Sequence, residues 1–318
     1  MKSKRLPHDL VVMYHSIESE KFPAVLGSYP ISLRRFQYQV EQLHRLGYEI
    51  ADLDTSYGLN DGVKRAFLTS DDGTVDWLHN VLSWCESEQL PTHTALLSGP
   101  WHETPVYPLA HRIQLALSLR QKGELYELFQ VIEQQITQNQ RDYIHYAYQH
   151  ESCKIRRMIK GALNLVWDEQ QATEILGEPS VKERYHLQER FAHFHEYKDL
   201  KFASFGTHTH SHRSFSGSAQ AYFEEEILYA EIFLRDKGLK LSRYFTLPLK
   251  PKINQSMDVL IGILSRHGFK GMLTSDCVSC TNLDSFIVPR IDAAHLEKWL
   301  GVAEYSVFKD TGKIIRAL

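Results

Sequence analysis

A short, largely apolar run that ends in two carboxylates and a glycine decides the fold: RAFLTSDDG, residues 65–73. A second apolar run, LKFASFG (residues 200–206), is followed after one residue by the histidine-rich stretch HTHSH (residues 208–212). Both patterns put metal-binding side chains where a strand ends and a loop begins. Because active sites of parallel sheets and barrels lie at the carboxyl ends of strands, we expect the two clusters to meet there. Together they predict the mononuclear metal site of a hydrolase, with one carboxylate to spare.

The spacing of the histidines predicts which of them bind the metal. In an extended chain, His208 and His212 would lie about 13 Å apart at ~3.3 Å per residue, too far for one ion. In a helical turn, positions i and i+4 share one face, with Cβ atoms roughly 5–6 Å apart. We therefore predict a helical turn, with His208 and His212 as ligands and His210 pointing elsewhere. With 17 histidines in the chain, a surface cluster without metal is the alternative.

The two neighbouring carboxylates, Asp71 and Asp72, are expected to differ in role, because successive side chains at a strand end diverge. One can bind the metal while the other accepts a proton from the attacking water, whose pKa a metal lowers. Gly73 permits a tight turn beside the ion. The pattern alone does not assign the two roles, and an ordinary Asp-Gly turn is the simpler alternative.

The composition is that of a globular enzyme. The 318 residues, 43% apolar and 24% charged, can bury one large core. A formal charge of −3 without a basic run argues against a nucleic-acid partner. Without an apolar stretch of about 18 residues or a signal-peptide pattern, we expect no membrane span and a cytoplasmic chain. Four unevenly spaced cysteines suit a reducing compartment, and we interpret the C-x-x-C of Cys277 and Cys280 as a loop.

Apolar runs alternate with helical patterns along most of the chain, which predicts βα units and a parallel sheet. Strands are expected at 10–17, 66–70, 92–97, 244–247, 270–274 and 286–288, and helices at 33–46, 75–89, 220–237 and 256–267. Residues 101–199 show only helical spacing and are too many for a loop, so we interpret them as a helical insertion. A lid, a gauge of substrate length and a dimer surface are all compatible with it. Four of its aromatic residues could stack on sugar rings: Tyr143, Tyr146, Trp167 and Tyr185. Their helical spacing favours packing in a core instead.

Four segments resemble the polysaccharide deacetylase family, the NodB homology domain of carbohydrate esterase family 4. TSDDG (69–73) resembles its T-F-D-D-G motif, and HTHSH (208–212) its H-[ST]-x-x-H motif. VMYHSI (12–17) is similar to the family's "MYH" strand, and VPRID (288–292) to the "PRI" segment of members from surface-polysaccharide gene clusters. The resemblance implies one domain over residues 1–318, folded as a distorted (β/α) barrel of seven strands.

The resemblance also implies site roles. Asp71 would be the catalytic base, while Asp72, His208 and His212 would bind Zn²⁺ or another divalent metal such as Co²⁺.

Other roles follow from the later segments. Pro248 matches the family's proline, the backbone N–H of Leu249 would stabilise an oxyanion, and His15 would contact substrate. Thr246 stands where the family has an arginine that braces the base, so Arg290 is expected to replace it. His295 is the nearest match to the family's acid, and it reads equally well as the first residue of a helix.

The function that these features imply is metal-dependent removal of an N-acetyl group from an amino sugar in a surface-polysaccharide precursor. The partner would be an N-acetylated amino sugar or saccharide. An O-acetyl esterase of the same fold is one alternative. A catalytically inactive carbohydrate-binding member is the other, because Thr246 and the weak acid motif depart from the family pattern. Sugar identity, chain length and oligomeric state are left open.

Overall fold

A mostly parallel sheet forms the centre of the molecule. The computed structural model describes residues 6–18, 30–149, 151–191, 194–252, 255–275 and 286–305. Neighbouring strands of the main sheet follow one another in the order β10 (Ile287–Pro289), β9 (Gly271–Thr274), β8 (Leu241–Thr246), β7 (Ala203–Thr207), β6 (Thr92–Leu96), β5 (Arg65–Ser70), β1 (Asp9–Tyr14) and β11 (Ile291–Asp292). Each pair is parallel. The short β4 (Glu49–Ile50) adds to β5, and β2 (Ile17–Glu18) pairs separately with β3 (Ile31–Ser32).

The two ends of this sheet meet at one residue. Only Arg290 separates β10, which pairs with β9, from β11, which pairs with β1. A single extended segment, residues 287–292, therefore joins both edges and nearly closes the sheet into a barrel. Counted as one strand, it brings the total to the expected seven, and the distorted (β/α) barrel is confirmed.

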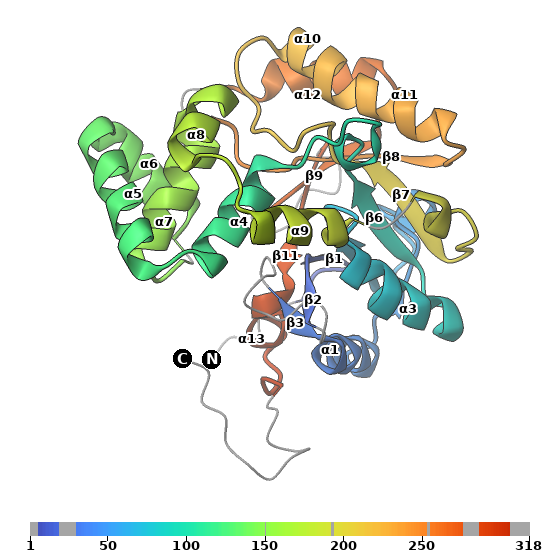
Figure 1. Ribbon diagram of the computed structural model, residues 1–318. Helices are drawn as coiled ribbons and strands as arrows, with labels where there is room; N and C mark the ends of the chain where they lie inside the picture. The colour runs from blue at the N-terminus through green and yellow to red at the C-terminus, as the bar shows by residue number, and fades with distance from the viewer. Residues whose placement is uncertain are drawn as a thin grey trace.

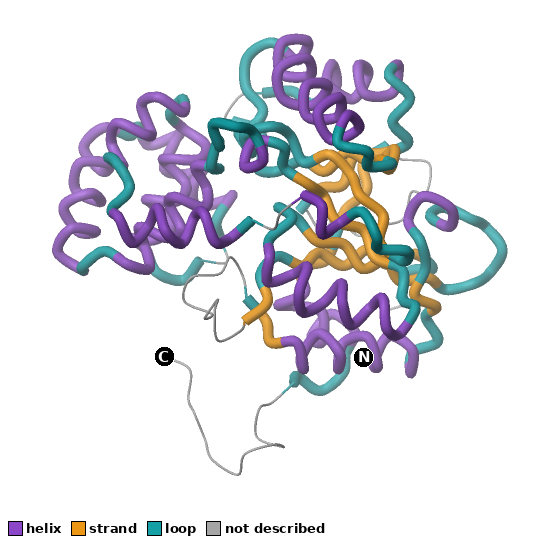
Figure 2. Tube along the Cα trace, turned by 45° about the vertical axis from the view of Figure 1, so that its right-hand side comes forward, coloured by secondary structure: helices purple, strands orange, loops and turns teal. Residues whose placement is uncertain are grey.

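Helices cover the outside of the barrel (Figures 1 and 2). They are α1 (Leu33–Arg45), α2 (Leu53–Ser56), the π-helical turn Trp77–Leu82 with α3 (Ser83–Glu88), α10 (Ala219–Tyr222), the π-helical turn Phe223–Leu228 with α11 (Tyr229–Asp236), α12 (Asp258–Arg266), the 3-10 turn Ala293–His295 and α13 (Leu296–Leu300). The hydroxyl of Ser32 caps α1 by accepting the N–H of Arg35. The helix then buries Phe36, Val40 and Leu43 at the spacing of one helical face.

A second group of helices lies between β6 and β7 along the sequence, although these two strands are neighbours in the sheet. It comprises the 3-10 turn Gly99–Trp101, α4 (Leu109–Leu119), α5 (Lys122–Gln135), α6 (Gln138–Ala147), α7 (Lys154–Gly161) with the turn Ala162–Val166, α8 (Glu169–Leu176), α9 (Val181–Arg190) and the 3-10 turn Phe194–Tyr197. The helices α5 to α8 form a bundle to the left of the barrel in Figure 1, while α4 and α9 lie next to the barrel. The bundle and α4 share an apolar core separate from that of the barrel, which includes Ile113 of α4, Ile132 of α5 and Met158 of α7.

Most expected elements are present, with shifted ends. The first strand ends at Tyr14 rather than at residue 17, and the one expected at 244–247 begins at Leu241. Cys277 and Cys280 lie outside the described residues. In the described part of the chain, no helix has both the length and the apolar character needed to cross a membrane.

Candidate metal centre

The carboxylate pair sits on a tight turn at the end of β5. The N–H of Asp71 donates to the carbonyl of Tyr14 at the end of β1 (3.2 Å), so the turn begins inside the sheet. Asp72 and Gly73 then both adopt left-handed backbone conformations, with φ of 75° and 69°. At this φ an L side chain is strained, and a Cβ on residue 73 would also lie 2.6 Å from a methyl group of Leu96, so glycine is favoured here. The left-handed Asp72 costs about 1–3 kcal/mol, a strain that is typical of functional sites.

The histidine stretch is not helical, and the predicted helical turn is wrong. Thr209 and His212 are left-handed, with φ of 74° and 65°. Side chains, rather than carbonyls one turn back, accept the N–H groups of this loop: Glu226 accepts from His210 (3.1 Å) and Ser211 (2.9 Å), and the Thr209 hydroxyl accepts from His212 (3.0 Å). The buried carboxylate of Glu226 thus holds the loop in place.

This loop nevertheless brings the expected histidines together. The rings of His208 and His212 lie 4.9 Å apart, and their Nε2 atoms lie 3.4 and 3.2 Å from Oδ1 of Asp72. His210 points away and its Nδ1 lies 2.9 Å from the hydroxyl of Ser98. Ligand atoms of Asp72, His208 and His212 all lie within 4.8 Å of one another, and all three residues are buried.

The unused atoms of this triad fit a metal ion. Nδ1 of His208 donates to the carbonyl of Thr246 (2.9 Å), which leaves the lone pair of Nε2 directed at Asp72. Within the described residues, neither Nε2 of His208 nor Oδ1 of Asp72 has a hydrogen-bond partner. Buried polar atoms without partners are costly, and a divalent cation would satisfy both.

Asp71 does not belong to this triad, and it is held by Arg290. The guanidinium donates to both carboxylate oxygens, Nη1 to Oδ1 at 2.6 Å and Nη2 to Oδ2 at 2.7 Å. This is the contact expected from the sequence. Burial opposes ionisation of Asp71, but the attraction of Arg290 outweighs it, so the pKa of Asp71 lies below its ordinary value. Asp71 is therefore an ionised carboxylate at neutral pH.

The structure places the other predicted site residues at different distances from this centre. Nε2 of His15 lies 3.8 Å from Oδ2 of Asp71, in the loop after β1. His295 is exposed at the start of α13. Pro248 and Leu249 lie in the loop after β8, and Leu249 lines the pocket described below. Thr246 contributes its carbonyl, which orients His208.

Two residues of the helical insertion, His111 and Arg190, reach the centre, and no sequence motif points to either. Nε2 of His111, on α4, lies 3.1 Å from Oδ2 of Asp72. Nη1 of Arg190, the last residue of α9, lies 2.9 Å from Nδ1 of His111. Burial lowers the pKa of His111 to about 4 against the attraction of Asp72, so the imidazole is neutral at pH 7. Burial opposes ionisation of Asp72 too, yet His111 and the other two histidines hold its pKa well below its ordinary value.

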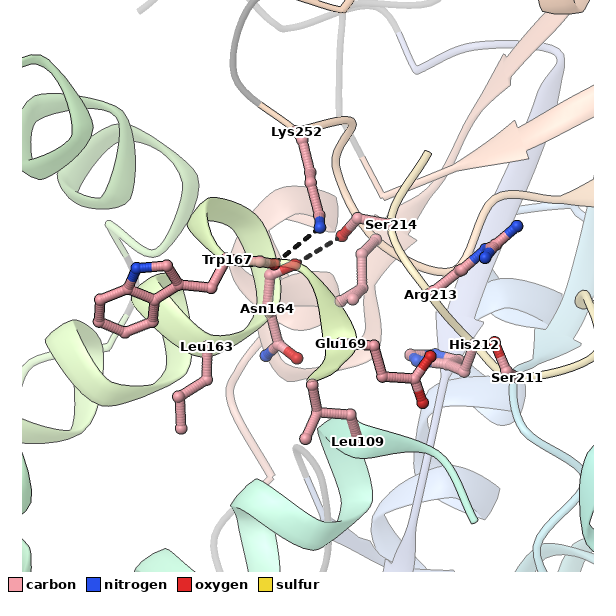
Figure 3. A pocket seen from close by; sticks show the side chains of 11 residues that line it. Leu109, Leu163, Asn164, Trp167, Glu169, Ser211, His212, Arg213, Ser214 and Lys252 are labelled. Carbon is pink, nitrogen blue, oxygen red and sulfur yellow. Dashed lines mark hydrogen bonds between the residues drawn. The ribbon is translucent and has the colours of Figure 1, made fainter. Parts of the chain in front are cut away.

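A pocket opens beside the triad, between the insertion and the barrel loops (Figure 3). Its volume, counted together with the open solvent at its mouth, is about 300 Å³. The insertion contributes Leu109, Leu163, Asn164, Trp167 and Glu169, and the loops after β7 and β8 contribute Ser211, His212, Arg213, Ser214, Leu249 and Lys252. The ammonium of Lys252 donates to the carbonyl of Trp167 (2.7 Å), and the hydroxyl of Ser214 to that of Asn164 (2.9 Å). His212 lies at one end of the pocket, and the ring of Trp167 at the other.

Comparisons with known proteins agree with this architecture. No family model and no curated protein matches the chain. Among solved structures, IcaB from Ammonifex degensii is similar over 93% of this chain and 97% of its own, with 14% identity and a TM-score of 0.51. A de-N-acetylase from Aggregatibacter actinomycetemcomitans is similar over 90% of this chain and 95% of its own, with 13% identity and a TM-score of 0.49. The Streptococcus pyogenes deacetylase PplD is similar over 89% of this chain and 91% of its own, with 13% identity and a TM-score of 0.47. At such identities the likeness concerns the fold, and the chain has the fold of the NodB-like polysaccharide deacetylases, the family that its motifs resemble.

Proposed function

We propose that this protein is a metal-dependent hydrolase that removes the N-acetyl group from an amino sugar in a surface-polysaccharide precursor. One observation carries the proposal. An ionised carboxylate, Asp71, is held by Arg290 directly beside a buried Asp72, His208 and His212 triad whose free lone pairs converge. A base next to three ligands of this kind is the arrangement that metal-assisted hydrolysis requires.

The position of each residue in the site suggests its role in the reaction. Zn²⁺ or Co²⁺ held by the triad would act as a Lewis acid on the acyl carbonyl and on the attacking water. Asp71 accepts the proton of that water, and Arg290 keeps its carboxylate ionised and oriented. His15 replaces His295 as the proposed acid, because it lies 3.8 Å from Asp71 whereas His295 is exposed at the start of α13. An amide releases an amine, which needs a proton donor, so an imidazole beside the base favours an N-acetyl substrate.

The pocket beside His212 is the proposed place for the sugar. It borders the triad, and it offers hydrogen-bonding groups from Asn164 and Glu169 as well as the apolar wall of Leu249. The backbone N–H of Leu249 remains the proposed oxyanion donor. Of the aromatic residues considered for sugar stacking, Trp167 lines this pocket, although its ring packs on the apolar core of the insertion.

Acetate release from a panel of N- and O-acetylated sugars tests the proposal. The protein is stripped with a chelator and assayed alone, with Zn²⁺ and with Co²⁺, and free amine is measured beside acetate. We expect acetate and amine in equal amounts, and only with metal. Acetate without amine would assign the O-acetyl esterase instead. Absence of turnover on every sugar, together with binding to one of them, would assign the inactive binding protein.

A further inference from the structure

The helical insertion contacts the metal ligand Asp72 through His111. The two carboxylate oxygens of Asp72 face different partners: Oδ1 faces Nε2 of His208 and His212, while Oδ2 lies 3.1 Å from Nε2 of His111. The side chains of His111 and Asp72 are only 3% and 5% exposed. Water therefore competes little for Oδ2, and His111 decides how this carboxylate is turned.

The position of the His111 proton follows from its second contact. Nη1 of Arg190 lies 2.9 Å from Nδ1 of His111, and a guanidinium can only donate. Nδ1 must then accept, so the proton of the neutral imidazole sits on Nε2 and is donated to Oδ2 of Asp72. Because Oδ2 is occupied by this hydrogen bond, the lone pairs of Oδ1 remain for the site shared with His208 and His212.

The two residues that reach Asp72 in this way, His111 and Arg190, both belong to the insertion and are held in place by it. His111 lies in the first turn of α4 and its ring packs against Phe191, with the ring centroids 5.2 Å apart. Arg190 ends α9 and is 3% exposed. Phe191 also forms an antiparallel bridge with Thr74, two residues beyond Asp72. The insertion is thus anchored on the loop that carries the ligand.

We propose that His111 is a positioning residue, supplied by the insertion and oriented by Arg190, that fixes Asp72 for metal binding without itself binding the metal. The proposal rests on the metal-dependent function proposed above. Hydrogen-bond partners of ligands typically contribute about 10–100-fold to metal affinity. The insertion is then part of the metal centre, in addition to any role at the pocket.

Metal affinity of full-length variants, measured by competition with a chromogenic Zn²⁺ chelator, tests this inference. His111→Phe keeps the ring volume but has no donor, and we expect a loss of about 10–100-fold in Zn²⁺ affinity. His111→Gln places an amide donor and acceptor in a similar arrangement, and it should recover most of that loss. Tyr143→Phe removes a hydrogen bond from the insertion to the carbonyl of Pro251, far along the chain from Asp72, and should leave the affinity unchanged.

The Co²⁺ absorption spectrum separates positioning from direct ligation. We expect His111→Phe, loaded at saturating Co²⁺, to keep the wild-type band positions, because no ligand is lost. A spectrum shifted as for the loss of one nitrogen ligand would overturn the inference and make His111 a ligand. Unchanged Zn²⁺ affinity in His111→Phe, with wild-type protein binding metal normally, would reduce His111 to a packing role. If wild-type protein binds no metal, the proposed function fails, and this inference fails with it.

Discussion

Replacing Arg290 by glutamine is expected to lower the stability of the protein and to raise the pKa of its proposed base, Asp71. The guanidinium is 1% exposed and the carboxylate of Asp71 is 4% exposed, so the variant leaves a buried charge without its partner. Breaking a buried pair in this way costs about 3–5 kcal/mol. For a chain of this length, with an unfolding entropy of about 2.1 cal/mol/K per residue, that loss lowers Tm by roughly 5–8 °C.

The stability that Arg290→Gln loses is expected to depend on pH. Asp71 has a lowered pKa in the folded wild type, so its pair with Arg290 stabilises the protein above the ordinary pKa of aspartate. This stabilisation is lost as pH falls through the folded pKa. In Arg290→Gln, burial acts on Asp71 without the opposing guanidinium, so the pKa of this carboxyl is expected to rise. The difference in Tm between wild type and variant should therefore be largest near pH 7 and shrink in acid, while the acid limb of kcat/KM moves to higher pH.

Thermal unfolding and the pH profile of acetate release check both statements, and Arg35→Gln is the matched control. Arg35 also binds a carboxylate with two nitrogens, Nε at 2.7 Å and Nη2 at 2.8 Å from Glu297, but its side chain is 26% exposed and it joins α1 to α13. The control should lose less stability and keep the wild-type acid limb. An Arg290→Gln variant with wild-type Tm and an unmoved acid limb would refute the reasoning.

Three further substitutions test the centre. Asp71→Asn should keep its metal, by elemental analysis, yet lose about 10²–10⁴-fold in kcat, as for removal of a general base; turnover close to wild type would exclude Asp71 as the base. His208→Ala should lose most of its bound metal on dialysis, and a full equivalent in the purified variant would contradict the ligand assignment. Glu226→Gln removes the charge that pairs with Arg213 (3.1 Å) and puts an amide nitrogen where Oε1 accepts the hydroxyl of Ser211 (2.7 Å), so we expect about 1–3 kcal/mol less stability in thermal unfolding and weaker Zn²⁺ binding. If both are unchanged, Glu226 does not hold the histidine loop.

The sequence was most informative where the chemistry is local. The order of strands and helices follows from alternating apolar runs, and TSDDG and HTHSH placed Asp71, Asp72, His208 and His212 on strand ends that meet in space. Arg290 was predicted to contact Asp71 from a chemical requirement: a buried base needs a cation, and Thr246 does not provide one.

Prediction failed where the partner is distant along the chain. Spacing alone suggested a helical turn at the histidines, because the sequence does not reveal that Glu226 and Thr209 accept the N–H groups of that loop. His111 and Arg190 carry no motif and lie in helices whose pattern indicates only packing. Their proximity to Asp72 depends on how α4 and α9 dock on the barrel, and local patterns do not encode that docking.

The segment that closes the barrel, residues 287–292, also links the order of synthesis to the contacts of Asp71. Residues 287–292 leave the ribosome after all the other strands of the main sheet, and they complete the sheet by pairing with β9 on one side and with β1 on the other. Until they emerge, β1 and β9 are unpaired sheet edges, which are prone to join other chains. The same segment delivers Arg290 to Asp71. The carboxylate of Asp71 therefore loses water and gains its guanidinium partner in the same event, the closure of the barrel.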